Sequence, residues 1–148
     1  MTRYDYPGAP ARRDDGRGAP VFALVRAWVA GTVVLLFTEY LRLSLIHGHL
    51  TAGADGPETF PGRLMLIHLP NAACIAAAAW AAGRVHRDPF RDHALQHMPA
   101  AFTVPAVAQA LTMALQWGEL TAEGVLMSNA VLVVGCVAGY AADRLQEG

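Results

Sequence analysis

Four long apolar stretches dominate the chain, and each of them is long enough to cross a lipid bilayer. They cover residues 21–46, 64–85, 98–117 and 122–145. A helix needs about 20 mainly apolar residues to cross a hydrocarbon core of roughly 30 Å. The pattern therefore predicts an all-α integral membrane protein, in which residues 21–146 form a bundle of four transmembrane helices.

The first 20 residues have a different composition, because they are rich in Pro, Gly, Arg and Asp. A segment of this kind cannot bury enough apolar surface to fold, so we expect residues 1–20 to be a disordered tail. The apolar run that follows is longer than the core of a signal peptide, which has about 7–15 apolar residues, and no small-residue cleavage site follows it. We therefore expect this run to remain in the protein as its first helix.

The arginines predict how the bundle is oriented. Nine of the 11 basic residues fall on the side of the two termini and of the loop after the second stretch, and only Arg42 and Arg63 fall on the other side. Positive residues stay in short cytoplasmic segments of membrane proteins. We therefore expect a multi-pass protein of the plasma membrane with both termini in the cytoplasm. The net charge of −1 argues against a nucleic-acid partner, which requires a basic surface.

Polar side chains interrupt the apolar stretches where a lipid-facing helix would not carry them. Glu39 and Arg42 are three residues apart and therefore share one face of a helix. A charge in a transmembrane helix costs roughly 2.5–3.5 kcal/mol and usually faces the interior of a bundle. We interpret the two residues as an ion pair that His68 or Asn71 can join. The full set of candidate site residues is Glu39, Arg42, His68, Asn71, Gln109, Thr112, Gln116 and Asn129.

The third stretch carries a continuous polar stripe, because Gln109, Thr112, Gln116 and Glu119 follow one another in steps of three, four and three. Under the expected orientation, most of the candidate residues fall in the outer half of the membrane. One interpretation is a polar pocket that opens outward between the helices. The alternative is a network of interhelical hydrogen bonds that only holds the bundle together.

Small residues mark the surfaces through which helices approach one another. Gly135 and Gly139 form a GxxxG pair in the fourth stretch. They can pack inside the chain, or they can hold a second copy or a partner in a membrane complex, and a chain of only four helices favours internal packing. Cys74 and Cys136 lie inside the stretches, and we interpret both thiols as packing residues.

The histidines offer a metal site only weakly. His93 and His97 are four residues apart, a spacing that lets two imidazoles reach one metal ion, and Asp88 or Asp92 could complete such a site. The favoured interpretation is a cytoplasmic loop whose histidines, His86 included, are solvated. We therefore predict no metal site, and the sequence does not identify a cofactor. It also holds no nucleotide-binding loop, zinc-protease helix or nucleophile elbow.

Three functions remain open. The first is binding or transport of a small solute or cation, in which Glu39 binds a cation or proton and Gln109, Thr112 and Gln116 line the path. The second is an embedded enzyme acting on a lipophilic substrate, with Glu39 and His68 as the acid/base pair. The third is an accessory subunit of a larger membrane complex, in which the polar groups are structural. The polar stripe favours the first.

Overall fold

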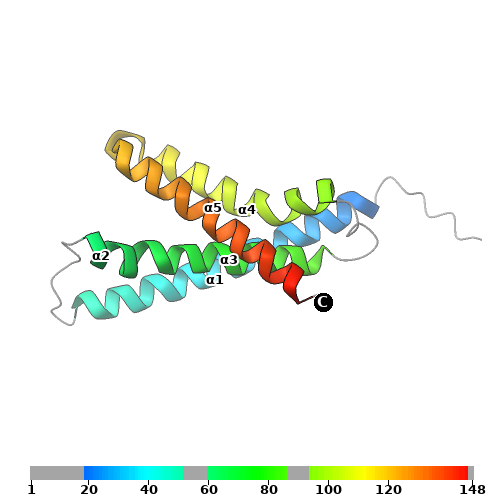
Figure 1. Cartoon of the computed structure of the whole chain (residues 1–148), viewed down its shortest axis with the longest axis horizontal. Coiled ribbons are helices and arrows are strands. Elements are labelled where there is room, and N and C mark those ends of the chain that lie inside the picture. Colours follow the sequence, from blue (N-terminus) through cyan, green and yellow to red (C-terminus); the bar gives the residue numbers. More distant parts are fainter. Residues whose placement is uncertain (1–18, 52–59, 87–93, 147–148) are drawn as a thin grey trace, which may run out of the picture.

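Four long helices form an antiparallel bundle in the computed structural model, which describes residues 19–51, 60–86 and 94–146 (Figure 1). The expected disordered tail falls almost entirely outside these residues. The elements are α1 (Ala19–Thr51), α2 (Phe60–Arg63), η1 (Leu64–His68), α3 (Leu69–Val85), α4 (Ala94–Leu115), η2 (Trp117–Glu119) and α5 (Ala122–Leu145). Two short segments, α2 and the π-helical η1, lead directly into α3, and the 3-10 helix η2 precedes α5.

The all-helical fold with four membrane-length helices is confirmed. The segments long and apolar enough to cross a membrane are Pro20–Leu45, Phe60–Val85, His97–Leu115 and Ala122–Leu145. The second of them begins four residues earlier than the sequence predicts, because α2 and η1 continue the helix toward its N-terminus. Many large apolar side chains on these segments are exposed in the isolated chain, as expected of surfaces that contact lipid. Insertion and orientation in a membrane stay predictions.

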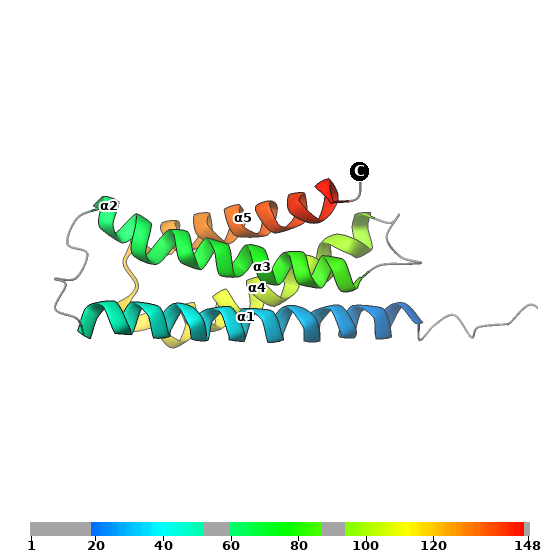
Figure 2. The ribbon, with the colours of Figure 1, turned by 90° about the horizontal axis from the view of Figure 1, so that it is seen from below.

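The two ends of the bundle differ in how closely the helices approach one another. The start of α1 and the end of α5 lie at the same end (Figure 2), which we call the terminal end, and the opposite end is the distal end. In Figure 1 the pair α4 and α5 diverges from the pair α1 and α3 toward the distal end. The candidate site described below lies on the distal side of the bundle.

Small residues bring α1 and α3 together. The buried positions of α1 recur every four residues, at Ala23, Ala27, Gly31 and Leu35, so they form one stripe along the helix. A Cβ atom on Gly31 would lie only 3.2 Å from the Cβ atom of Ala82. The absence of larger side chains on both faces therefore allows the two helices to pack closely.

The GxxxG pair of α5 packs against α3 inside the chain. A Cβ atom on Gly135 would lie 2.7 Å from Cγ2 of Ile75, and one on Gly139 would collide with the backbone carbonyl of Ala76. Both glycines are therefore needed where two helix backbones approach each other. In the folded chain α3 therefore covers this face of α5.

Candidate functional site

An ion pair on α1 forms the charged part of the candidate site. Arg42 Nη2 lies 2.5 Å from Glu39 Oε2, and Arg42 Nε donates a hydrogen bond of 2.8 Å to the same oxygen. Their side chains are 19% and 26% exposed respectively. Glu39 extends the buried stripe of α1, since it lies four residues beyond Leu35. The predicted ion pair of these two residues is confirmed.

A cavity of about 160 Å³ lies beside this pair, between α1, α3 and α4. Polar side chains from all three helices contribute to its wall, together with the apolar surface that separates them. Its lining residues are Leu35, Glu39, Arg42, Asn71, Ile75, Pro105, Ala108, Gln109 and Thr112. Five of the eight candidate residues from the sequence are therefore brought together around one cavity.

The polar groups around the cavity differ in how they are satisfied. Thr112 Oγ1 donates to the backbone carbonyl of Ala108 at 3.0 Å, so its oxygen can still accept a hydrogen bond. Within the described part of the chain, the amides of Asn71 and Gln109 have no hydrogen-bond partner. Each of these two side chains can therefore both donate to and accept from a bound molecule.

Pro105 shapes the α4 wall of the cavity. It lies inside the helix and is fully buried. Because proline has no N–H group, the carbonyl of Ala101 lacks its usual helical donor, and the proline ring disturbs the regular helix at this point. Ala108 and Gln109 follow Pro105 along the same wall of the cavity.

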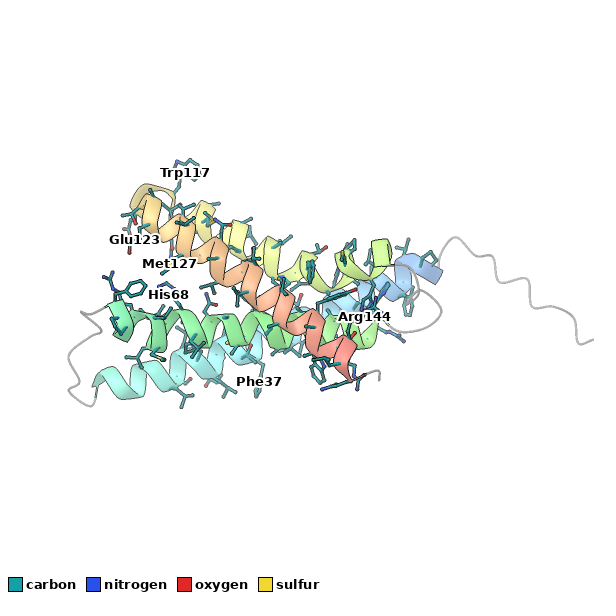
Figure 3. The ribbon with its side chains drawn as sticks, viewed as in Figure 1. Phe37, His68, Trp117, Glu123, Met127 and Arg144 are labelled. Atoms are coloured by element: carbon teal, nitrogen blue, oxygen red, sulfur yellow. The ribbon has the colours of Figure 1, made fainter. Side chains whose placement is uncertain are left out.

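Three candidate residues do not line the cavity. Gln116 follows the end of α4 and is exposed, and Asn129 is exposed and donates through Nδ2 to the carbonyl of Val125 at 2.8 Å. His68 ends η1 and is half-buried, on the side of α3 that faces α5 (Figure 3). Among the described residues no hydrogen bond or ion pair joins His68 to Glu39, the partner that an acid/base pair would require.

A second polar cluster lies at the terminal end, and we did not predict it from the sequence. His86, His97 and Asp143 are 2%, 1% and 1% exposed. His97 Nε2 lies 3.3 Å from Asp143 Oδ2, which joins α4 to α5. The prediction that His86 and His97 are solvated is therefore wrong, because α3, α4 and α5 converge over them.

The surroundings of this cluster are closely packed. The ring of His97 lies 5.6 Å from that of Tyr140 and 5.8 Å from that of His86, measured between centroids. A Cβ atom on Gly83 would lie 3.2 Å from Asp143 Oδ2, so this glycine leaves room for the carboxylate. Burial lowers the pKa of His86, and the charges of His97 and Arg26 lower it further.

One sequence signal does point to this cluster. Asp143 follows Gly135 and Gly139 in steps of four, so it lies on the same face of α5 as the two glycines that pack against α3. A carboxylate on such a face is expected to be buried. No corresponding signal selects His97 as its partner, since the two residues are 46 positions apart.

The metal-binding alternative can be compared with the structure only in part. His93, Asp88 and Asp92 lie outside the described residues, so their arrangement with His97 is not described. Within residues 19–51, 60–86 and 94–146, no group of three or more His, Cys, Asp or Glu side chains could hold a metal ion.

Comparisons with known proteins do not assign a family to this chain. No family model, no curated protein and no solved structure matches it. A function therefore has to be inferred from the chemistry of the chain's own side chains.

Proposed function

We propose that this protein is a small membrane transporter or solute-binding protein, and that the cavity between α1, α3 and α4 holds the solute. The observation that carries the proposal is the meeting of Glu39, Arg42, Asn71, Gln109 and Thr112 around one cavity. These residues come from three different helices, so the cavity exists only in the folded bundle. Enzymes and transporters commonly place such polar groups at their sites.

The cost of unpaired polar groups supports a functional cavity. An amide transferred to an apolar environment without hydrogen bonds costs about 1–3 kcal/mol by mutational measures. Asn71 and Gln109 would each carry this cost if the cavity were empty and dry. Water takes about 30 Å³ per molecule in the liquid. A cavity of about 160 Å³ therefore has space for a few waters or for a solute of similar total volume.

The position of the cavity along the bundle favours access of a solute from one side of the membrane. Glu39 lies six residues before the end of the first apolar segment at Leu45, and Gln109 lies six residues before Leu115. Each is therefore about 9 Å from the distal end of its own apolar segment, at 1.5 Å per residue. With both termini in the cytoplasm, the distal end faces outward. The buried His97 and Asp143 close the terminal end in this arrangement.

The two alternative functions receive less support. An enzyme that uses Glu39 and His68 as an acid/base pair needs the two side chains to meet, and His68 does not line the cavity. An accessory subunit that docks through Gly135 and Gly139 needs a free surface, and α3 already covers those glycines. We therefore retain solute binding as the proposal.

A pair of substitutions on α4 tests the proposal. Ala108 lines the cavity, whereas Ala110 is exposed on the outside of the same helix. Leucine at position 108 adds three carbons to the cavity wall, and leucine at position 110 adds them to the outer surface. The two variants therefore carry the same chemical change, and only Ala108→Leu places it in the cavity wall.

Native mass spectrometry of the protein in mild detergent provides the measurement. We expect a small extra mass on the wild type and on Ala110→Leu, and its loss from Ala108→Leu. An extra mass that survives in Ala108→Leu, or a bare mass in all three proteins after incubation with extracts of small molecules, contradicts the proposal.

A further inference from the structure

The wall of the cavity has no net charge. The carboxylate of Glu39 is neutralised by the guanidinium of Arg42 on the next turn of α1. The remaining polar lining residues are the amides Asn71 and Gln109 and the hydroxyl of Thr112, all uncharged. A cation therefore meets a carboxylate that already has a partner, which differs from the sequence-based expectation that Glu39 binds a cation or a proton.

The ion pair nevertheless keeps hydrogen-bonding capacity. Both contacts from Arg42 end on the single oxygen Oε2 of Glu39. In the described part of the chain, Glu39 Oε1 has no hydrogen-bond donor, and Arg42 Nη1 has no acceptor. The pair thus offers one carboxylate oxygen that accepts and one NH₂ group that donates.

The two amides repeat this combination of donor and acceptor. Asn71 on α3 and Gln109 on α4 each carry an NH₂ group and a carbonyl oxygen without a partner among the described residues. Together the four side chains offer both donors and acceptors, because Glu39 accepts, Arg42 donates, and each amide does both. A molecule that also carries both a donor and an acceptor can satisfy the groups on opposite walls.

A solute with a net charge fits this wall less well. Moving one ion from water into a low-dielectric site costs several kcal/mol unless an opposite charge compensates it. The wall has no such charge to spare, because Glu39 and Arg42 already compensate each other. A neutral molecule avoids this cost and keeps its hydrogen bonds.

We propose that the cavity selects small solutes without net charge that carry both a hydrogen-bond donor and an acceptor, of which a primary amide is the simplest, and rejects ions of the same shape. This inference rests on the proposed solute-binding function and names its substrate class. The ion pair of Glu39 and Arg42 then sets the charge of the accepted solute.

Three probe molecules separate charge from shape. Acetamide, acetamidinium and acetate have the same number of non-hydrogen atoms in the same planar arrangement, but they are neutral, cationic and anionic at neutral pH. Ligand-observed NMR with the full-length protein in detergent measures their dissociation constants, including weak ones. For the wild type we expect acetamide to bind at least about tenfold more tightly than either ion, a difference of about 1.4 kcal/mol.

Two single substitutions should change the preferred charge. Arg42→Gln leaves the Glu39 carboxylate alone, so acetamidinium becomes the tightest of the three. Glu39→Gln leaves the Arg42 guanidinium alone, so acetate becomes the tightest. The double variant Glu39→Gln/Arg42→Gln has a neutral wall again and should restore the preference for acetamide. It also buries no unpaired charge, so it keeps the test available if a single variant does not fold.

The outcomes separate this inference from the proposed function. An ion that binds the wild type as tightly as acetamide, absence of acetamide binding, or a preference that does not follow the charge of the wall overturns the inference. Loss of acetamide binding in Ala108→Leu but not in Ala110→Leu supports it by locating the bound molecule. The proposed function fails separately, if the native mass of the wild type and of Ala110→Leu carries no solute.

Discussion

The buried pair of His97 and Asp143 should contribute strongly to stability. Asp143→Asn keeps the shape of the side chain and removes its charge. Removing one partner of a buried hydrogen bond, so that the other polar group is left unsatisfied, costs about 1–3 kcal/mol. The two side chains are only 1% and 2% exposed, but the 3.3 Å separation is long for a hydrogen bond. We therefore expect a loss near the lower end of that range, about 1.5 kcal/mol.

A double-mutant cycle measures this contact directly. Reversible unfolding in mixed micelles gives the free energy of unfolding of the wild type, Asp143→Asn, His97→Gln and the double variant. If the pair interacts as the structure shows, the double variant loses about 1–3 kcal/mol less than the sum of the two single losses. Glu123→Gln on the exposed start of α5 is the control for removal of an acid, with a change within about 0.5 kcal/mol.

Two results would contradict the buried contact between His97 and Asp143. Additivity of Asp143→Asn and His97→Gln within about 0.5 kcal/mol means that the two groups do not interact. A loss below about 1 kcal/mol for Asp143→Asn means that the carboxylate is not buried as described.

Three further predictions concern helix packing, pH and capping. Gly139→Ala should destabilise the protein by about 1–3 kcal/mol because its methyl group meets α3, whereas Gly118→Ala should not, since nothing lies within 4 Å of that Cβ position. The pKa of His86 is lowered in the folded protein, so on acidification the unfolded chain takes up a proton at His86 before the folded protein does. The contribution of neutral His86 to stability is therefore complete above about pH 6.5 and is lost as the pH falls below it. In thermal melts, His86→Gln should lose less stability on acidification than the wild type. Thr121→Ala removes the side chain that caps α5 by accepting from Gly124 N at 3.1 Å, and should cost about 0.5–2 kcal/mol in the same unfolding assay.

Sequence alone was sufficient for features that depend on local spacing. The four helices follow from runs of apolar residues, and the contact between Glu39 and Arg42 follows from their separation of three on one helix. The meeting of Asn71 and Gln109 beside that pair was not predicted from the sequence. Their presence around one cavity depends on how α3 and α4 rotate, which spacing within each helix does not determine.

The incorrect predictions have the same physical cause, because spacing within one helix does not determine which neighbour each of its faces contacts. His97 is close to a loop rich in arginine, which favours a solvated interpretation, but the face of α4 that carries it packs against α5. Gln116 and Asn129 are polar and close to the cavity residues in depth, yet both are exposed, and Asn129 bonds its own helix. A polar residue in an apolar stretch therefore indicates the interior only when its helix face is also known.

If the protein binds a solute as proposed, the cavity beside Glu39 admits water and small solutes within the membrane. Thiol labelling tests it in a chain whose two cysteines, Cys74 and Cys136, are replaced by alanine. Gln109→Cys places a thiol in the cavity wall, and Leu111→Cys places one on the outer surface of the same helix, where Leu111 is 60% exposed to the surroundings of the bundle. A membrane-impermeant thiol reagent is added to the outside of intact cells. We predict labelling of Gln109→Cys and none of Leu111→Cys. Labelling of neither variant, or equal labelling of both, would contradict a cavity that opens to the outside.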